Sequence, residues 1–244
     1  MHFVAIKMLT GDRAKYLGLI FTIAFASFLL ANQVSIFAGI IKRTASQING
    51  VVDADIWVMD PATEYFDEVK PSKTTDLLRV RGVPGVEWGV RLFKGLPRMT
   101  APDGRFRAVI LMGLDDDSLV GAPHGKMRLG NLQSLREPDS IVLDYAGYRY
   151  FWPNDPLELD RTMEMNDHRV RIVGISDASA PFTTFPVVFA RYSQAIQYVG
   201  PERNLLSFVL VKAKPGVDPS ALATSISKAT GLSAMTNEAF AWRQ

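Results

Sequence analysis

The chain has 244 residues, of which 48% are hydrophobic and 21% charged, and its formal net charge at neutral pH is +2. It contains no cysteine, which excludes disulfides, thiolate catalysis and cysteine-based metal sites. Residues 1–49 hold five Lys/Arg and one Asp, whereas residues 50–244 hold 22 Lys/Arg and 24 Asp/Glu. The larger part therefore shows no basic patch of the kind that binds nucleic acid, and no nucleic-acid partner is expected.

The most informative segment is a run of 26 residues without charge, Tyr16 to Ile41. As a helix it would be roughly 39 Å long, and the hydrocarbon core of a bilayer is about 30 Å thick. The run predicts a transmembrane helix over about residues 16–43. A signal peptide is the first alternative, since Ala24 and Ala26 fit a cleavage pattern, but cleavage there would leave many apolar residues behind. A core helix is the second alternative, although such helices usually have a polar face.

The span divides the chain into two predicted parts. Residues 1–49 form a short cytoplasmic lead-in and the membrane helix, and residues 50–244 form one large domain. Basic residues flank the span on both sides, so their number decides its orientation only weakly. Large domains are exported largely regardless of charge. We therefore expect the N-terminus in the cytoplasm and the domain outside.

Small side chains recur along one side of the span at steps of three and four residues. They are Ala24, Ser27, Ala31, Ser35 and Ala38. Small residues let helices approach closely in lipid, and an amide such as that of Asn32, which flanks the stripe, seeks a partner on another helix. The six residues are predicted to be helix-packing positions. Small residues are also common in membrane spans that pack against nothing, and this alternative stays open.

The domain is predicted to be of mixed α and β structure, so that the fold class is α+β with an N-terminal transmembrane helix. Helices are expected from Ser72, as N-cap, to Gly82, over the aromatic stretch 145–152, and from Asp218 to Gly231. The expected strands are residues 54–59, 86–100, 105–114, 140–144, 157–163, 169–175, 186–190 and 205–213. Pro102-Asp103-Gly104 and Asn166-Asp167-His168 predict hairpin turns.

Signals for catalysis are poor, and no catalytic, cofactor-binding or metal-binding residue is assigned. The histidines His2, His124 and His168 lack ligand spacing. Asp115–Asp117 lacks the alternating ligands of a calcium loop and is interpreted as a solvated turn after a strand. The run Gly121–Lys126 is one residue short of a phosphate-binding loop. No G-x-S-x-G motif occurs.

The aromatic stretch has two interpretations. Its aromatic residues are Tyr145, Tyr148, Tyr150, Phe151 and Trp152. They form either a contact surface for a partner or a helix whose aromatic side chains fill the core beneath a turn at Pro153. The second interpretation is preferred.

Several short motifs follow one another in a characteristic order. They are Lys7-Met8-Leu9, Asp12-Arg13-Ala14-Lys15, Ala54-Asp55-Ile56-Trp57-Val58, Val83-Pro84-Gly85-Val86, Met112-Gly113-Leu114-Asp115, Val173-Gly174-Ile175, and Val209-Leu210-Val211 with Gly216-Val217-Asp218. In order and spacing the chain resembles an FtsX-like ABC transporter permease with a MacB-type periplasmic core domain. It is most similar to the DevC-like permeases, which work with an HlyD-type adaptor.

This resemblance implies a function that is mechanical rather than chemical. The chain would be a permease subunit, in the inner (cytoplasmic) membrane, of an ABC-type export or mechanotransmission complex. Its implied partners are a cytoplasmic ABC ATPase subunit, an HlyD-type membrane-fusion adaptor, a second copy of the permease and membrane lipid. The chain would be no enzyme and need no cofactor, because the partner subunit hydrolyses ATP.

One departure from the family pattern matters. Family permeases carry four membrane helices, three of them after the core domain, whereas this chain reaches Gln244 without another. We therefore expect a truncation before the second membrane helix. Two further functions stay open: a single-pass membrane-anchored binding or sensor domain, and a secreted or anchored enzyme of unrecognised type.

Overall fold

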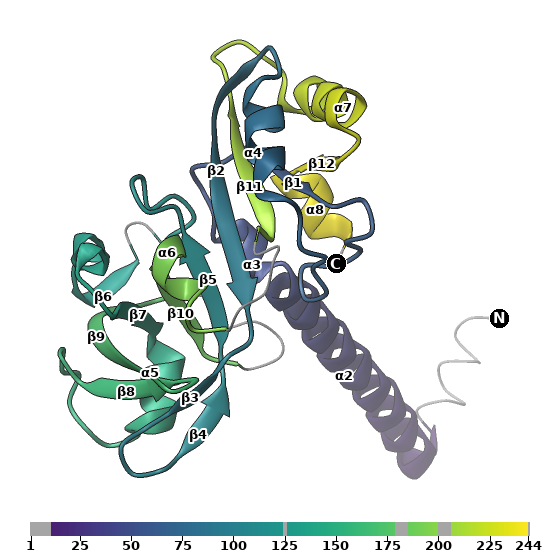
Figure 1. Cartoon of the computed structure of the whole chain (residues 1–244). Helices are drawn as coiled ribbons and strands as arrows, with labels where there is room; N and C mark the ends of the chain where they lie inside the picture. Colours follow the sequence, from purple (N-terminus) through teal and green to yellow (C-terminus); the bar gives the residue numbers. More distant parts are fainter. Residues whose placement is uncertain (1–10, 124–125, 179–184, 200–205, 244) are drawn as a thin grey trace. The chain divides into compact units, whose positions relative to one another are not determined.

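The structure is a computed structural model that describes residues 11–123, 126–178, 185–199 and 206–243, with residues 41 and 42 described by their backbone alone. The chain divides into two compact units, Met1–Arg43 and Thr44–Gln244. The second unit is called the head. Figure 1 shows the course of the chain from purple at the N-terminus to yellow at the C-terminus.

The described residues of the first unit lie mostly in one long helix. Helix α2 (Arg13–Thr44) has 32 residues and is therefore about 48 Å long. Its large apolar side chains are exposed on every side, for example Phe21 at 70% and Leu30 at 68%. The segment Arg13–Ile40 is long and apolar enough to cross a membrane. A helix that is apolar all round is typical of a membrane span, and the predicted span lies within α2.

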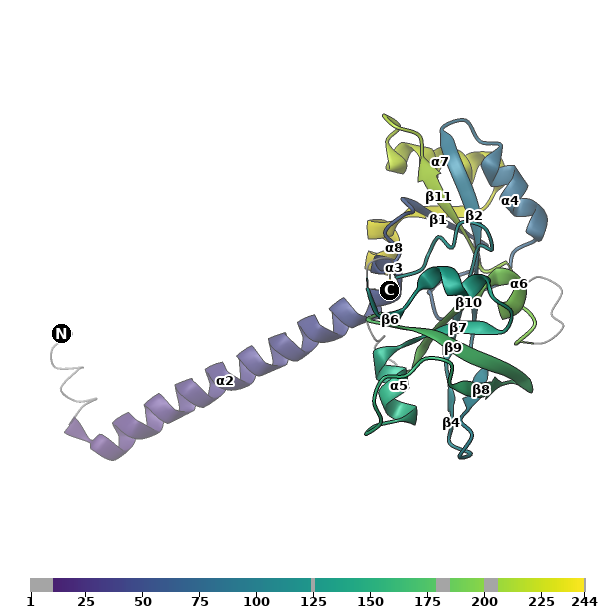
Figure 2. The ribbon, with the colours of Figure 1, turned by 90° about the vertical axis from the view of Figure 1, so that its left-hand side faces the viewer.

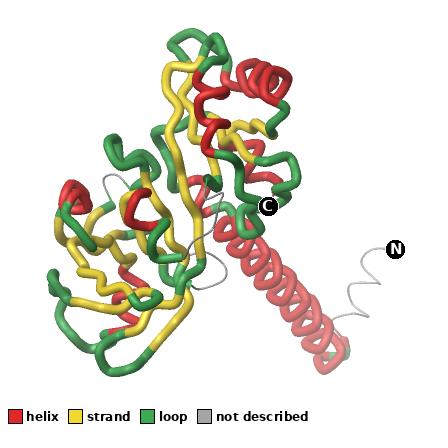
Figure 3. Tube along the Cα trace, viewed as in Figure 1, coloured by secondary structure: helices red, strands yellow, loops and turns green. Residues whose placement is uncertain are grey.

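The head is built on one branched sheet, whose strands are yellow in Figure 3. The strands are β1 (Ile56–Met59), β2 (Val86–Gly95), β3 (Arg98–Thr100), β4 (Phe106–Ala108), β5 (Ile110–Leu114), β6 (Met127–Gly130), β7 (Ser140–Asp144), β8 (Thr162–Met165), β9 (His168–Ser176), β10 (Val187–Arg191), β11 (Phe208–Ala213) and β12 (Ser233–Thr236). Their order is β12-β1-β11-β2-β5-β10-β7-β9-β8-β3-β4, and β6 pairs with β9 beside this path. The pairs β10–β5 and β7–β9 are parallel.

Short helices lie at the margins of this sheet. They are α3 (Ser46–Asn49), α4 (Thr74–Arg81), α5 (Tyr145–Phe151), α6 (Tyr192–Ala195), α7 (Pro219–Thr230) and α8 (Asn237–Arg243), with a 3-10 turn η1 (Leu132–Arg136). Helix α4 contacts β2, helix α7 contacts β12, and the two helices contact each other. Figures 1 and 2 show α4 and α7 side by side. Helix α6 contacts β2, β5 and β10, and α5 contacts β7 and β9.

Strand β1 separates two cores because successive side chains of a strand point to opposite faces. Ile56 and Val58 belong to the cluster beneath α4 and α7. Trp57 and Met59 belong to a second cluster, which also contains Met112 and Phe189 on the distant strands β5 and β10. This second cluster, called the central core, therefore extends along the sheet.

The predicted mixed α/β fold after an N-terminal apolar helix is confirmed, and most strands lie where the sequence places them. Two predicted strands are each divided in the structure. Residues 86–100 form β2 and β3, interrupted at Leu96-Pro97, where proline has no N–H for the ladder. Residues 105–114 form β4 and β5. The hairpin turn between β3 and β4 is where it was predicted, and Gly104 there has φ +85°.

Two boundaries differ from the prediction. Ser72 does not cap α4, which begins at Thr74 with Lys73 as N-cap. Ser72 forms an antiparallel bridge with Leu206 instead, and its N–H donates to the Leu206 carbonyl at 2.8 Å. Strand β8 begins at Thr162 rather than at Leu157. Helix α7 starts and ends as predicted, with Asp218 accepting a hydrogen bond from Ala221 N at 2.9 Å.

Candidate functional site

The predicted helix-packing residues all lie in α2 and are all exposed: Ala24, Ser27, Ala31, Asn32, Ser35 and Ala38. At 100° per residue the five small side chains fall within an arc of about 80°, and Asn32 lies about 60° from its edge. Between Ala24 and Ala38 this arc holds small side chains only, while Leu17 and Ile20 continue it toward the N-terminus with large ones. Their role in packing stays a prediction.

The head begins immediately after the membrane helix. Arg43 is exposed, but Ala45, two residues further on, is only 7% exposed. Ile48 of α3 is fully buried in the central core. Asn49 N donates to the Ala45 carbonyl at 3.0 Å, which makes the first residues of the head helical. The packed part of the head therefore begins at Ala45.

The last helix of the described residues packs against the first helix of the head, since α8 contacts α3. Asn237, which starts α8, donates from Nδ2 to the Ala54 carbonyl at 2.8 Å and to the Val51 carbonyl at 3.4 Å. Its backbone N donates to the Asp55 carbonyl at 3.1 Å. We call α3, residues 51–55 and α8 the junction. It brings the start and the end of the head together.

An aromatic cluster fixes the junction to the sheet. The ring of Trp57 lies 5.2 Å from that of Phe208 and 5.6 Å from that of Phe240, measured between centroids. Phe66 stacks on Phe208 at 5.4 Å. Such aromatic pairs contribute about 0.5–1.5 kcal/mol each beyond their burial. Through Phe240 the cluster holds α8, so the junction is a rigid part of the head.

A buried lysine lies beside this cluster. The Lys94 side chain is 3% exposed, and its Nζ donates to the Phe66 carbonyl at 2.8 Å and to Asp67 Oδ1 at 2.7 Å. Burial lowers the pKa of Lys94, and Asp67 partly offsets this effect. Lys94 also borders a pocket of about 270 Å³, to which Asn166 and Ser207 contribute polar groups.

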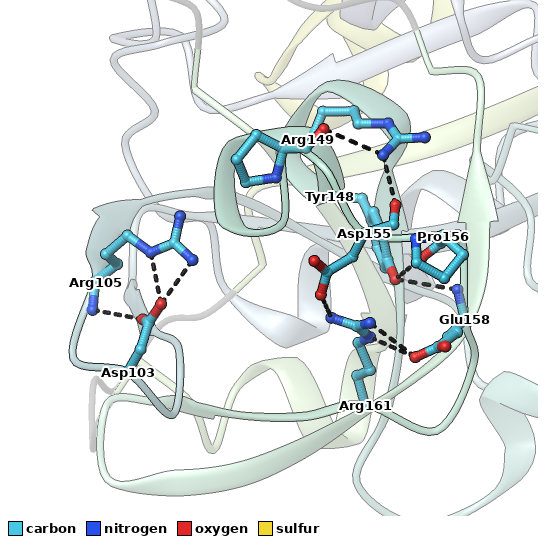
Figure 4. A network of polar contacts seen from close by, with 9 residues as sticks. Asp103, Arg105, Tyr148, Arg149, Asp155, Pro156, Glu158 and Arg161 are labelled. Atoms are coloured by element: carbon cyan, nitrogen blue, oxygen red, sulfur yellow. Dashed lines mark hydrogen bonds and ion pairs between the residues drawn. The ribbon is translucent and has the colours of Figure 1, made fainter.

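The aromatic stretch is a structural helix, as the preferred interpretation held. Tyr148 and Phe151 of α5 are fully buried. Figure 4 shows how the Tyr148 hydroxyl donates to the Pro156 carbonyl at 2.8 Å and accepts from Glu158 N at 3.0 Å. Arg161, at 2.7 Å from Asp155, closes the network. These contacts bind α5 to the loop that follows it.

The acidic run after β5 differs from its predicted solvated state. Asp115 is buried, and its Oδ2 accepts from the Ser118 hydroxyl at 3.0 Å. Asp116 accepts from the Ser193 hydroxyl at 2.7 Å and pairs with Arg91 at 3.6 Å. The run therefore joins α6 and β2 to the end of β5. Only Asp117 is exposed.

Within the described residues, no group of three or more His, Asp or Glu side chains is placed to hold a metal ion. His168 is exposed and lies 5.6 Å from the Tyr198 ring between centroids. His2, His124 and residue 125 of the Gly121–Lys126 run lie outside the described residues.

Sequence reasoning did not find the junction, because its residues are far apart along the chain. Its one local signal is the pattern of a helix start after Thr236, whose Oγ1 accepts from Ala239 N at 3.2 Å.

The comparisons with known proteins agree with this architecture. The head is similar to the crystal structure of the periplasmic region of MacB from Actinobacillus actinomycetemcomitans, with a TM-score of 0.56 and 13% identity over 78% of this chain and 92% of that one. It is also similar to the extracellular domain of the noncanonic ABC-type transporter YknZ from Gram-positive bacteria, with a TM-score of 0.53 and 11% identity over 75% and 98% of the two chains. At these identities the likeness shows the fold. No curated protein sequence matches the chain.

The family model of the MacB-like periplasmic core domain matches residues 17–229, which include most of α2 and nearly all of the head. The resemblance to an FtsX-like permease with a MacB-type core domain is thereby confirmed. The chain belongs to the family of the MacB-like periplasmic core domain.

Proposed function

We propose that the chain is a permease subunit of an ABC-type export or mechanotransmission complex, in which a separate cytoplasmic ATPase drives movement of the head. The carrying observation is the family match over residues 17–229, which covers the candidate span and the head together. In this proposal α2 crosses the inner membrane once, the N-terminus is cytoplasmic and residues 50–244 are extracytoplasmic. ATP is hydrolysed in the partner subunit and not in this chain.

The junction supports a mechanical role. In this proposal a movement of α2 reaches the sheet through the residues that follow Arg43, where an unpacked segment would absorb it. Ala45 and Ile48 are instead buried, and Ile48 packs in the same cluster as Trp57 and Phe240. Close-packed interiors transmit displacement because they contain few voids. A shift or rotation at Thr44 is therefore passed to β1 and α8.

The remaining partners follow from the same proposal. Helix α2 packs against other membrane helices through the stripe of small residues and Asn32. These helices belong either to the second permease copy in a homodimer or to the same subunit. The residues of this surface are Ala24, Ser27, Ala31, Asn32, Ser35 and Ala38. An HlyD-type membrane-fusion adaptor binds the head, and lipid covers the larger apolar side of α2.

A tethered ligand-binding head is the alternative, and the pocket beside Lys94 is the feature in its favour. The Lys94 ammonium group, however, is already engaged by the Phe66 carbonyl and by Asp67. Asn166 Nδ2 likewise donates to the Tyr198 carbonyl at 2.8 Å. Because these polar groups serve the fold, the pocket offers a ligand little, and we favour the permease.

Topology and partner capture test the proposal. The chain has no cysteine, so single cysteines can be introduced at Gly11 and at Leu78, both exposed. A membrane-impermeant maleimide should label Leu78→Cys in intact cells and Gly11→Cys only after lysis. The full chain, cross-linked in its native membranes and purified, should carry an ATP-binding subunit identified by mass spectrometry.

Labelling of both cysteines only after lysis would place the head in the cytoplasm and contradict the proposal. The control is a known ATPase–permease pair that the same procedure captures from the same membranes. If this pair is captured and the chain shows the expected labelling but carries no ATPase, the result would favour the tethered domain.

A further inference from the structure

A small hollow lies beside α3, the first helix of the head. Ser46 and Gly50 line it from α3, Met112 and Phe189 line it from β5 and β10, and Gly121 lines it from the turn after β5. Its volume is about 20 Å³. A hollow of about 10–15 Å³ or more can hold a water molecule where polar groups line it. This one therefore admits a single water and no larger ligand.

One polar group at the hollow is the hydroxyl of Ser46. The Ser46 Oγ is buried and has no hydrogen-bond partner in the described part of the chain. Leaving a buried hydroxyl unpaired is unfavourable, and in folded proteins most such groups are paired with protein or with ordered water. Ser46 therefore needs a partner that the surrounding residues do not provide.

A second polar group comes from the backbone of Gly121. The residue is buried, and among the described residues its backbone N–H and C=O form no hydrogen bond. Buried backbone groups are nearly always paired. The φ angle of Gly121 is +96°, a conformation that favours glycine. Two unpaired polar residues, one on α3 and one on the turn after β5, thus line the same hollow.

Other occupants fit this hollow less well. None of the described residues that line it carries a carboxylate or an imidazole, the side chains that hold metal ions in a protein without cysteine. An apolar side chain of a partner would fill the hollow but leave the Ser46 hydroxyl and the Gly121 backbone unpaired. A water molecule both donates and accepts hydrogen bonds, so it satisfies both residues.

We propose that the hollow binds one water molecule, which bridges the Ser46 hydroxyl and the Gly121 backbone. The water joins α3 to the turn after β5, in which Asp116 accepts from the Ser193 hydroxyl and pairs with Arg91. It thereby ties the junction to the part of the sheet that contains β5. The water site goes beyond the proposed function and depends neither on the membrane nor on an ATPase.

Two variants of equal shape test the bridge. Threonine and valine differ only in a hydroxyl and a methyl group, so Ser46→Thr keeps the polar partner and Ser46→Val removes it. The equilibrium constant for unfolding of the full chain in detergent should be about 5- to 150-fold larger for Ser46→Val, because valine leaves the Gly121 backbone without its bridge. In a dry hollow the order is reversed, since valine then avoids the burial of an unpaired hydroxyl.

The same pair of substitutions at an exposed helix position is the control. Ser220 lies in the first turn of α7 and is exposed. Its threonine and valine variants should differ in the equilibrium constant for unfolding by less than about threefold.

A crystal structure of the full chain in detergent shows the water directly. The wild type should have density for one ordered water at about 2.5–3.0 Å from Ser46 Oγ, and Ser46→Val should lack it. Density that shows a dry hollow in the wild type would overturn the inference. So would a valine variant that is at least as stable as the threonine variant.

Discussion

Asn237 and Ala54 are joined by a hydrogen bond of 2.8 Å, although 183 residues separate them in sequence. Ala54 precedes the first strand of the head, and Asn237 starts its last described helix. The bond closes the head into a loop whose two ends meet at the junction. In the proposed function, a force that enters through α3 therefore meets a closed structure, in which β1 and α8 would move together.

Replacing Asn237 by alanine should loosen this closure. The Ala54 carbonyl would lose its partner, and an unsatisfied buried group costs about 1–3 kcal/mol. We expect the free energy of unfolding of the full chain in detergent to fall by about this amount. Hydrogen exchange should accelerate in α8 and α3 before it does in β7 or β9.

The neighbouring Glu238→Ala is the control, because Glu238 is exposed. It should change the free energy of unfolding by less than about 0.5 kcal/mol. Equal effects of the two substitutions, or an unchanged exchange rate in α3, would contradict the closure.

Ile48 and Phe240 should be energetically coupled. Both are fully buried in the central core, one on α3 and one on α8. Each substitution to alanine should destabilise the head by about 2–5 kcal/mol. The helices α3 and α8 contact each other, and residues of one packed cluster show coupling energies of about 0.5–3 kcal/mol, so a double-mutant cycle in chemical denaturation should be non-additive. Additivity would mean that the junction does not act as one unit.

Much of the fold could be predicted because its signals are local. The hairpin between β8 and β9 turns at Asn166 and Asp167, whose φ angles of 45° and 68° are those that asparagine and aspartate tolerate. The helix α7 carries its own start, Asp218-Pro219, and its own end, Gly231 at φ 72°. Strand β7 was predicted to the residue. In each case the sequence near the element determines its limits.

Elements that depend on distant partners were missed. Strand β12 is half-buried throughout and short, and it exists because it pairs with β1. Strand propensity is weak evidence where packing decides. The cap of α4 was misplaced for a similar reason, since Ser72 bonds to Leu206 across the sheet. Likewise, the stripe on α2 could be predicted from its helical period, while the junction could not.

Bulk on the stripe should weaken assembly. In an intact complex, Ala31→Leu would separate α2 from the helix on which it packs, because close approach needs small side chains. We expect the permease dimer, or its complex with the ATPase, to dissociate at lower detergent concentration in native gels. Leu29→Phe adds bulk on the other side of α2 and should leave assembly unchanged. Unchanged assembly with Ala31→Leu would refute the stripe.

Asp144 should make the stability of the head depend on pH. The residue is fully buried at the start of α5, where its Oδ1 accepts from Gly147 N at 3.1 Å and from Val187 N at 3.0 Å. Its Oδ2 is buried without a hydrogen-bond partner in the described part of the chain. Burial raises the pKa of Asp144 from 3.8 to about 6, although the two N–H groups act against this.

A raised carboxyl pKa means that the folded state binds the proton more tightly than the unfolded state does. The contribution of Asp144 to stability is therefore fully present below pH 3.8 and is lost as the pH rises through about 6.

Asp144→Asn keeps the Oδ1 acceptor and cannot ionise. The variant should be more stable than the wild type at pH 7, by up to about 3 kcal/mol, and the gap should close near pH 4. Denaturant unfolding of both proteins between pH 4 and 8 measures the difference, in which the other acidic groups cancel. A constant gap, or a variant that is less stable at pH 7, would show that the Asp144 carboxylate is well accommodated and that its burial carries no such penalty.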